Sequence, residues 1–213
     1  LDTITEMPIP AVPAQAATGI ERWRSALNGV AETQPYAPAR LDSLLATEKG
    51  GAFVQGLFGG SLFLAAVAAQ QPQFCLDLFE QGPDAVWPSV LAILHETTAN
   101  DATAKRLLRT ARKRAALAIA VGDVSGAWTI EQVTNALSDI ADACIEYALA
   151  FTLRELQARG RLNLTDPDHP ARGSGFIILG MGKLGARELN YSSDIDLIAL
   201  YDPEIVPTER PDR

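Results

Sequence analysis

The chain has 213 residues, of which 47% are hydrophobic and 21% are charged. This composition is typical of a globular protein and excludes an intrinsically disordered chain. The net charge of −8 argues against sequence-independent binding to nucleic acid and against docking on an anionic membrane surface, because both need a positively charged protein surface.

The apolar segments and the cysteines indicate the cellular compartment. No apolar run reaches the about 20 residues that a membrane span needs, and the first residues lack the basic and apolar regions of a secretory signal. Cys75 and Cys144 lie in apolar stretches with no second cysteine or histidine at metal-ligand spacing. This pattern favours buried thiols over a disulfide, so we expect a reducing compartment and a cytoplasmic protein.

The first part of the chain predicts short helices. Residues 7–19 are rich in proline and alanine and are expected to form an extended lead-in. Between Ile20 and Gln81, glycines and prolines break several short apolar segments, which predicts a set of short packed helices. Ser61 is a predicted N-cap for a helix over 62–69.

The middle of the chain predicts two long helices, because no proline occurs between Pro88 and Pro167. We expect the first helix over 101–120. The second should begin near Thr129, where Thr129-Ile-Glu-Gln132 has the sequence of a capping box, and end near Gly160. Its apolar residues recur in steps of three and four, which marks one helical face: Ile130, Val133, Leu137, Ile140, Cys144, Ala148 and Phe151.

Beyond a polar connection over 161–174 the pattern changes to strands. Phe176-Ile-Ile-Leu179 is wholly apolar, as expected for a buried strand. A glycine-rich segment over 180–185 follows, then a short helical stretch over 186–191. Asp194-Ile-Asp-Leu-Ile-Ala-Leu-Tyr201 predicts a second strand. The elements together predict an α+β protein that is mostly helical. Because two strands rarely form a stable sheet alone, we expect this chain to be part of a longer protein.

One hypothesis for the glycine-rich segment is dinucleotide binding. Gly180, Gly182 and Gly185 match the G-x-G-x-x-G pattern after a strand, and Asp202 ends the next strand. Two observations argue against it. The helix after the glycines is too short to cover a sheet. The two aspartates that open the second strand would also have no function, although aspartate is a poor strand former.

The alternative hypothesis is metal-dependent nucleotidyl transfer. Side chains alternate along a strand, so Asp194 and Asp196 should point to the same side. Two adjacent carboxylates repel each other unless a cation joins them, and Mg²⁺ is commonly held by a few carboxylates together with substrate phosphates. A turn at Gly182-Lys183 would let a phosphate approach backbone amides, and the hydroxyls of Ser192 or Ser193 could donate to the same phosphate.

These residues carry a resemblance to known families. Gly182-Lys183 followed by Asp194-Ile-Asp196 resembles the signature of the polymerase-beta-like nucleotidyltransferase superfamily. The longer string from Gly180 to Leu197, Gly-Met-Gly-Lys-Leu-Gly-Ala-Arg-Glu-Leu-Asn-Tyr-Ser-Ser-Asp-Ile-Asp-Leu, is similar to the glutamine synthetase adenylyltransferase family. Those bifunctional enzymes add AMP to a tyrosine of glutamine synthetase and remove it, which regulates nitrogen assimilation. They carry two nucleotidyltransferase domains, and Arg187-Glu-Leu-Asn190 resembles the first, adenylyl-removing copy.

The resemblance implies an organisation and a set of site residues. It implies a helical domain over 1–160, a linker over 161–174 and the truncated start of a nucleotidyltransferase domain over 175–213. Asp194 and Asp196 would be catalytic and bind Mg²⁺. Nucleotide and phosphate would be bound by Gly180, Gly182, Lys183, Ser192 and Ser193. Ala186 stands where the family usually has a second glycine, a small change that we expect to be tolerated.

The implied reaction is phosphorolysis of adenylyl-tyrosine on glutamine synthetase, which releases ADP. The implied partners are glutamine synthetase, ATP or ADP, phosphate and a signalling protein of the PII type. The superfamily needs a third carboxylate on a later strand, beyond residue 213, so we expect this chain to hold half an active site and to be inactive alone. ATP-dependent adenylyl transfer to the same tyrosine, dinucleotide binding and a purely regulatory role stay open as alternatives.

A basic run on the first long helix has two interpretations. It is either a solvated face paired with acids or a contact surface for phosphates or an acidic partner. The run contains Lys105, Arg106, Arg109, Arg112, Lys113 and Arg114. We favour the solvated face.

Overall fold

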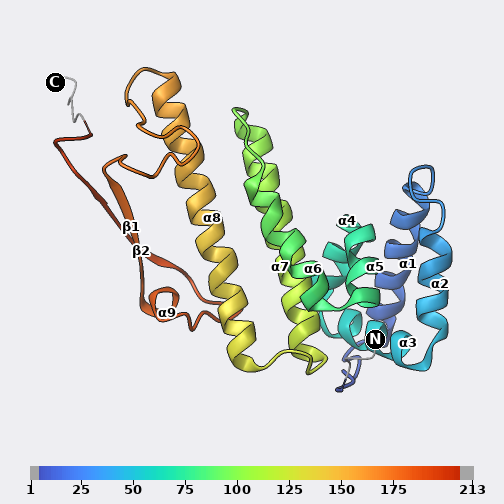
Figure 1. Ribbon diagram of the computed structural model, residues 1–213. Coiled ribbons are helices and arrows are strands. Elements are labelled where there is room, and N and C mark those ends of the chain that lie inside the picture. The colour runs from blue at the N-terminus through green and yellow to red at the C-terminus, as the bar shows by residue number, and fades with distance from the viewer. Residues whose placement is uncertain (1–4, 207–213) are drawn as a thin grey trace. The chain divides into compact units, whose positions relative to one another are not determined.

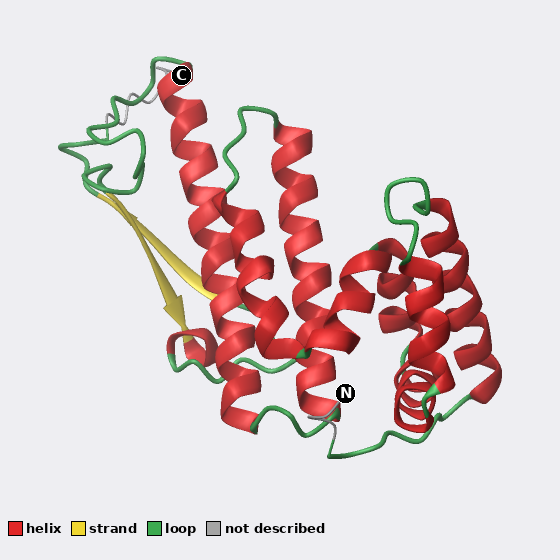
Figure 2. Ribbon diagram, turned by 45° about the vertical axis from the view of Figure 1, so that its right-hand side comes forward, coloured by secondary structure: helices red, strands yellow, loops and turns green. Residues whose placement is uncertain are grey.

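The computed structural model describes residues 5–206, and within them helices predominate over one two-stranded sheet (Figure 1 and Figure 2). The predicted α+β class is confirmed. The tertiary contacts divide the chain into two units. Unit 1 contains residues up to 91 and 110–133, and unit 2 contains 92–109 and residues from 134 onward. The predicted linker over 161–174 falls within unit 2, and the predicted domain boundaries stay a prediction. Residues 1–4 and 207–213 of those domains lie outside the described residues.

The short helices predicted for the first part of the chain are present in unit 1. The lead-in prediction is wrong beyond residue 12, because the first helix, α1, begins at Pro13. Proline has a helical φ and no N–H to leave unpaired, so it is favoured in the first turn of a helix. These helices are α1 (Pro13–Gly29), α2 (Ala37–Ala46), α3 (Glu48–Gly60), α4 (Leu62–Gln70), α5 (Pro72–Gln81) and α6 (Pro83–Ala92).

Side-chain caps set two of these helix starts. The Ser61 hydroxyl accepts a hydrogen bond from the Leu64 amide at 3.2 Å, which confirms the predicted N-cap of α4. Thr47 does the same for α3 by accepting from the Gly50 amide at 3.0 Å. Both oxygens satisfy an amide at the helix start that has no partner within the helix.

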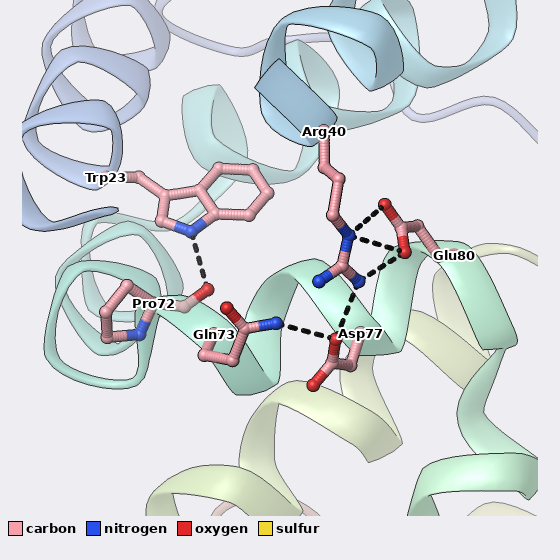
Figure 3. Close-up of polar contacts among 6 residues, drawn as sticks. All are labelled: Trp23, Arg40, Pro72, Gln73, Asp77 and Glu80. Carbon is pink, nitrogen blue, oxygen red and sulfur yellow. Dashed lines mark hydrogen bonds and ion pairs between the residues drawn. The ribbon is translucent and has the colours of Figure 1, made fainter. Parts of the chain in front are cut away.

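An aromatic cluster forms the core of unit 1. Trp23 is fully buried, and its ring centroid lies 5.7 Å from that of Phe58 and 5.6 Å from that of Phe79. The indole nitrogen of Trp23 donates to the Pro72 carbonyl at 3.0 Å, so burial leaves no polar atom of the ring unpaired (Figure 3). This contact joins α1 to the start of α5.

A charged network lies beside that core. Arg40 of α2 donates to Asp77 at 2.8 Å and to both carboxylate oxygens of Glu80 on α5 (Figure 3). Gln73 also donates to Asp77, at 2.8 Å. The hydrogen bonds that Arg40 donates to Glu80 and Asp77 raise the pKa of Arg40 above its usual value. The planar guanidinium can serve two carboxylates at once, which fixes the spacing of α2 and α5.

Residues of the basic run are used within the structure. In unit 1, Arg114 lies over the Phe74 ring at 5.1 Å and donates to Gln71 at 2.8 Å, and burial lowers the pKa of Arg114. In unit 2, Lys105 forms an ion pair with Asp101 at 2.8 Å. The contacts of these two residues agree with a structural role for the run.

Two long helices follow η1, a short 3₁₀ helix over Ile93–His95, and are named α7 (Asp101–Val124) and α8 (Ile130–Ala158). The predicted capping box is present at the start of α8. The Gln132 amide donates to the Thr129 hydroxyl at 3.3 Å, and the Thr129 amide donates to the Gln132 side chain at 2.8 Å. Gly160, with a φ of +68°, follows the end of α8 as predicted.

The sheet of unit 2 consists of β1 (Phe176–Met181) and β2 (Asp196–Tyr201), paired antiparallel with Phe176 opposite Tyr201 and Met181 opposite Asp196. The prediction of a buried first strand is wrong, since Ile177 is 57% exposed, and all of β2 is exposed. An apolar run indicates that a strand can be covered on both faces. Whether it is covered depends on what else packs on it.

Two further sequence predictions concern membranes and thiols. Among the described residues no one helix has the length and apolar composition of a membrane span, although α3 and α4 together, bent by 114°, meet that measure. Cys75 and Cys144 are not joined in a disulfide, as predicted. Cys75 is buried, which raises the pKa of its thiol well above the usual value, whereas Cys144 is half-buried.

Candidate functional site

The glycine-rich segment forms a tight turn after β1. A single helical turn, α9, covers Gly182–Gly185, and Gly182 has a φ of +54°, which favours glycine. A Cβ at Gly185 would lie 2.4 Å from the Gly180 carbonyl oxygen, so the backbone could not close in this way around a larger residue. The predicted helix over 186–191 is wrong. The helical turn lies within the glycines, and residues 186–191 form turns and irregular backbone.

The second aspartate of the Asp194-Ile-Asp196 motif lies beside this turn. Asp196 opens β2 opposite Met181, the residue before Gly182. Its carboxylate oxygen Oδ2 lies 3.5 Å from the position that a Cβ of Gly182 would occupy. A side chain at Gly182 would therefore contact this carboxylate. The pairing of the strands thus brings the glycine turn and Asp196 together, as the nucleotidyl-transfer hypothesis requires.

Asp194 differs in part from the prediction. The predicted strand begins two residues too early, because β2 begins at Asp196 and Asp194 lies in the preceding irregular segment. The alternation of side chains along a strand therefore does not apply between the two aspartates. Both are exposed and accessible to a soluble ligand.

The other predicted residues lie in two segments, the glycine turn and the turn before β2. Gly180 is in β1, and Lys183 is an exposed residue of α9. Ser192 is exposed, and its amide donates to the Asn190 side chain at 3.3 Å. Ser193 donates its hydroxyl hydrogen to the same Asn190 oxygen at 2.7 Å. This bond stabilises the turn before β2, and the role of the two serines in phosphate binding stays a prediction.

Sequence reasoning missed the environment of Arg187. Among residues 5–206, Arg187 is the one non-glycine residue with a positive φ, of 60°. Its guanidinium contacts three residues of α8: Asn135, Asp139 and Asp142. Asp139 contributes most to raising the pKa of Arg187. Because these partners are distant in sequence, no local pattern could have identified them.

The donor set fits Mg²⁺ in part. Mg²⁺ is commonly held by few protein carboxylates together with substrate phosphates, and Asp194 and Asp196 are two exposed carboxylates close in sequence. Among residues 5–206, no group of three or more histidine, cysteine, aspartate or glutamate residues is arranged to hold a metal. Asp194 and Asp196 are therefore suited to supply part of a coordination shell.

The strand pairing weighs against the dinucleotide hypothesis. That motif needs two parallel strands joined through a crossover helix, with the pyrophosphate at the start of the helix. Here β1 and β2 are antiparallel, and α9 is a single turn. A hollow of about 490 Å³ elsewhere in unit 2, lined by Phe151, Arg154 and Asp168 among others, includes none of the predicted site residues.

Comparison with known proteins identifies the family. The sequence profile described as "Glutamate-ammonia ligase adenylyltransferase" matches residues 53–210. The chain belongs to this family. A relative from Bradyrhizobium diazoefficiens is 38% identical over 194 residues, which cover 90% of this chain and 19% of the relative. One from Xanthobacter autotrophicus is 41% identical over 176 residues, which cover 81% of this chain and 18% of the relative.

Both relatives are named bifunctional glutamine synthetase adenylyltransferase/adenylyl-removing enzyme. The chain spans about a fifth of the length of these relatives. No solved structure matches the chain significantly. The family comparison therefore confirms the resemblance found in the glycine-rich and aspartate motifs, and it does not distinguish which of the two activities this part of the family performs.

Proposed function

We propose that this chain is the N-terminal part of a bifunctional enzyme and begins the domain that removes AMP from adenylyl-tyrosine on glutamine synthetase. The observation that carries the proposal is the Asp196 carboxylate beside the Gly182 turn, in a family whose curated relatives are named for both addition and removal of the adenylyl group. The sequence Arg187-Glu-Leu-Asn190, which resembles the adenylyl-removing copy, favours removal over addition.

In the proposed reaction an oxygen of inorganic phosphate forms a bond to the phosphorus of the adenylyl group. The bond between that phosphorus and the tyrosine oxygen breaks, the tyrosine oxygen takes the proton that the attacking hydrogenphosphate loses, and ADP leaves. The amides around Gly182 and the ammonium of Lys183 would bind phosphate oxygens. Since α9 is a single turn, the Lys183 charge would contribute more than any helix dipole.

Asp194 and Asp196 would hold Mg²⁺, which neutralises phosphate charge and polarises the phosphorus when bound. Ser192 and Ser193 would orient the phosphates. A third carboxylate would come from a later part of the whole protein, so residues 1–213 alone should release no ADP. The preceding helices would position glutamine synthetase or transmit a signal from a PII-type partner, and the enzyme would work in the cytoplasm.

The test uses the whole protein that contains this chain. It is mixed with adenylylated glutamine synthetase, phosphate and Mg²⁺, and ADP release is measured. Asp194→Asn and Asp196→Asn should each lower the rate by at least about two orders of magnitude, because each removes a charged metal ligand. Asp168→Asn, at an exposed aspartate of unit 2, is the control and should leave the rate unchanged.

Two outcomes would contradict the proposal. If the whole protein releases no ADP but transfers AMP from ATP to the tyrosine, this copy works in the direction of addition. If the Asp→Asn variants keep full activity, the metal site is elsewhere. A tight complex with NAD that forms without Mg²⁺ would restore the dinucleotide hypothesis.

A further inference from the structure

We propose that Arg187 is a positioning residue that couples the glycine turn to one face of α8, so that the position of α8 controls phosphate binding at Gly182-Lys183. That the turn binds phosphate rests on the proposed function. That Arg187 couples the turn to α8 rests on the contacts of Arg187 alone.

The backbone at Arg187 has the conformation that usually selects glycine. The Glu188 amide donates to the Lys183 carbonyl at 2.8 Å, and the Arg187 amide donates to the Leu184 carbonyl at 3.0 Å. This pair of bonds is the Schellman motif that ends a helix, in which the residue with positive φ is most often glycine. Arginine occupies that position here with a φ of 60°, against the preference of its backbone.

The Arg187 side chain makes contacts that glycine could not make. Its Nε donates to Asn135 at 3.2 Å and its Nη1 to Asp142 at 3.3 Å, and Nη2 contacts Asp139. The three acceptors are spaced by four and three residues, so they lie on one face of α8. The rigid fork of the guanidinium serves all three, which defines one orientation of the turn on the helix.

Apolar burial alone would leave that orientation less defined. Leu184 and Leu189, on either side of Arg187 in sequence, are each 4% exposed and hold the segment by burial. Burial is not directional, whereas the hydrogen bonds of Arg187 are. Because the same Schellman motif uses the carbonyl of Lys183, a shift at Arg187 would move the predicted phosphate-binding residue directly.

The decisive variant is Arg187→Gly in the whole protein, because glycine keeps the backbone conformation and removes the side chain. We expect a melting temperature equal to or above that of the wild type. We also expect at least a fivefold higher KM for phosphate in ADP release, and Arg187→Lys should recover only part of the loss. Arg172→Gln, at an exposed arginine of the same unit, is the matched control and should leave KM unchanged.

A second variant tests the coupling from the side of α8. Asp139→Asn combined with Asp142→Asn should raise the KM for phosphate as Arg187→Gly does. Adding Arg187→Gly to this pair should have little further effect, because both changes break the same contact. If the effects multiply instead, Arg187 and α8 act separately and the proposal is wrong.

Hydrogen exchange separates this proposal from the proposed function. Arg187→Gly should increase amide exchange over 186–190 at least fivefold, with exchange elsewhere in α8 and in the Arg172→Gln control unchanged. Unchanged exchange over 186–190 would overturn the coupling even if the enzyme releases ADP. Increased exchange in a protein that releases no ADP would retain the coupling and reject the proposed reaction.

Discussion

Gly122 gives Trp128 the space to pack against α7. A Cβ at Gly122 would lie 2.6 Å from Cδ2 of the Trp128 ring. The ring is also held by a hydrogen bond from its nitrogen to Asp84 at 2.9 Å and by an edge-to-face contact with Trp87 at 5.7 Å. It therefore has little freedom to move away from a larger residue.

We expect Gly122→Ala to lower the free energy of unfolding by up to about 2 kcal/mol. Overpacking costs about 1–3 kcal/mol, and the helix-propensity gain of about 1 kcal/mol offsets part of it. Urea unfolding of the 213-residue chain measures the change. Gly60→Ala is the control, because nothing lies within 4 Å of a Cβ there, and it should be neutral or stabilising. Equal effects of the two variants would contradict the packing argument.

The energies at Arg187 indicate whether this residue contributes to stability or to positioning. A left-handed conformation costs a non-glycine residue about 1–2 kcal/mol. The side chains of Arg187, Asp139 and Asp142 are 45%, 41% and 49% exposed, and exposed ion pairs contribute only about 0–1 kcal/mol each. The two terms roughly cancel, so stability alone does not explain an arginine where glycine would suffice. The proposed role of Arg187 in orienting the glycine turn does explain the arginine.

At the scale of elements, α8 depends on the capping box at its start. Thr129→Ala removes the acceptor for the Gln132 amide, and we expect a loss of about 1 kcal/mol in the free energy of unfolding. The control is Thr152→Ala in the same helix. There the hydroxyl donates back to the Ala148 carbonyl at 2.8 Å, and because alanine has the higher helix propensity, the change should be neutral or stabilising.

Urea unfolding of both variants measures the change. If Thr129→Ala has the same free energy of unfolding as the wild type, the capping box does not stabilise α8 and the helix is held by packing alone.

The sheet shows the limit of inference from apolar runs. In an antiparallel pair opposite residues share a face, so Leu179 and Ile198 form one apolar surface with Ile177 and Leu200. All four are more than 40% exposed: Ile177 57%, Leu179 43%, Ile198 43% and Leu200 48%. The local sequence predicts a strand. It does not predict whether other residues of the described chain pack against that strand.

At the scale of the whole molecule, hydrogen exchange should separate the helical core from the sheet. We expect amides of β2, which is exposed along its length, to exchange at least about a hundredfold faster than those of α3, whose Phe53 and Phe58 are fully buried. Mass spectrometry of the 213-residue chain measures both in one digest, with peptides of α7 as an internal reference. Protection of β2 as strong as that of α3 would contradict the exposed sheet.

Much of this protein follows from local chemistry. Thr129 and Ser61 cap helices because a hydroxyl at the right spacing satisfies an amide whatever the rest of the chain does. Gly182 and Gly185 form a turn because the positive φ at Gly182 favours glycine and a Cβ at Gly185 would clash with the Gly180 carbonyl oxygen. The glycine-rich and aspartate motifs also carried enough specific residues to indicate the family before any comparison.

Other features were decided only by the tertiary structure. The antiparallel pairing of β1 with β2, the start of β2 at Asp196 rather than Asp194, and the reach of Arg187 to α8 all depend on contacts between residues distant in sequence. Hydrogen bonds and burial between such residues form only when the chain has folded, so no local pattern of spacing or composition records them. The sequence by itself therefore determined the two long helices, the caps of α4 and α8, the glycine turn and the family. The folded chain decided which carboxylate lies beside that turn and what holds the turn in place.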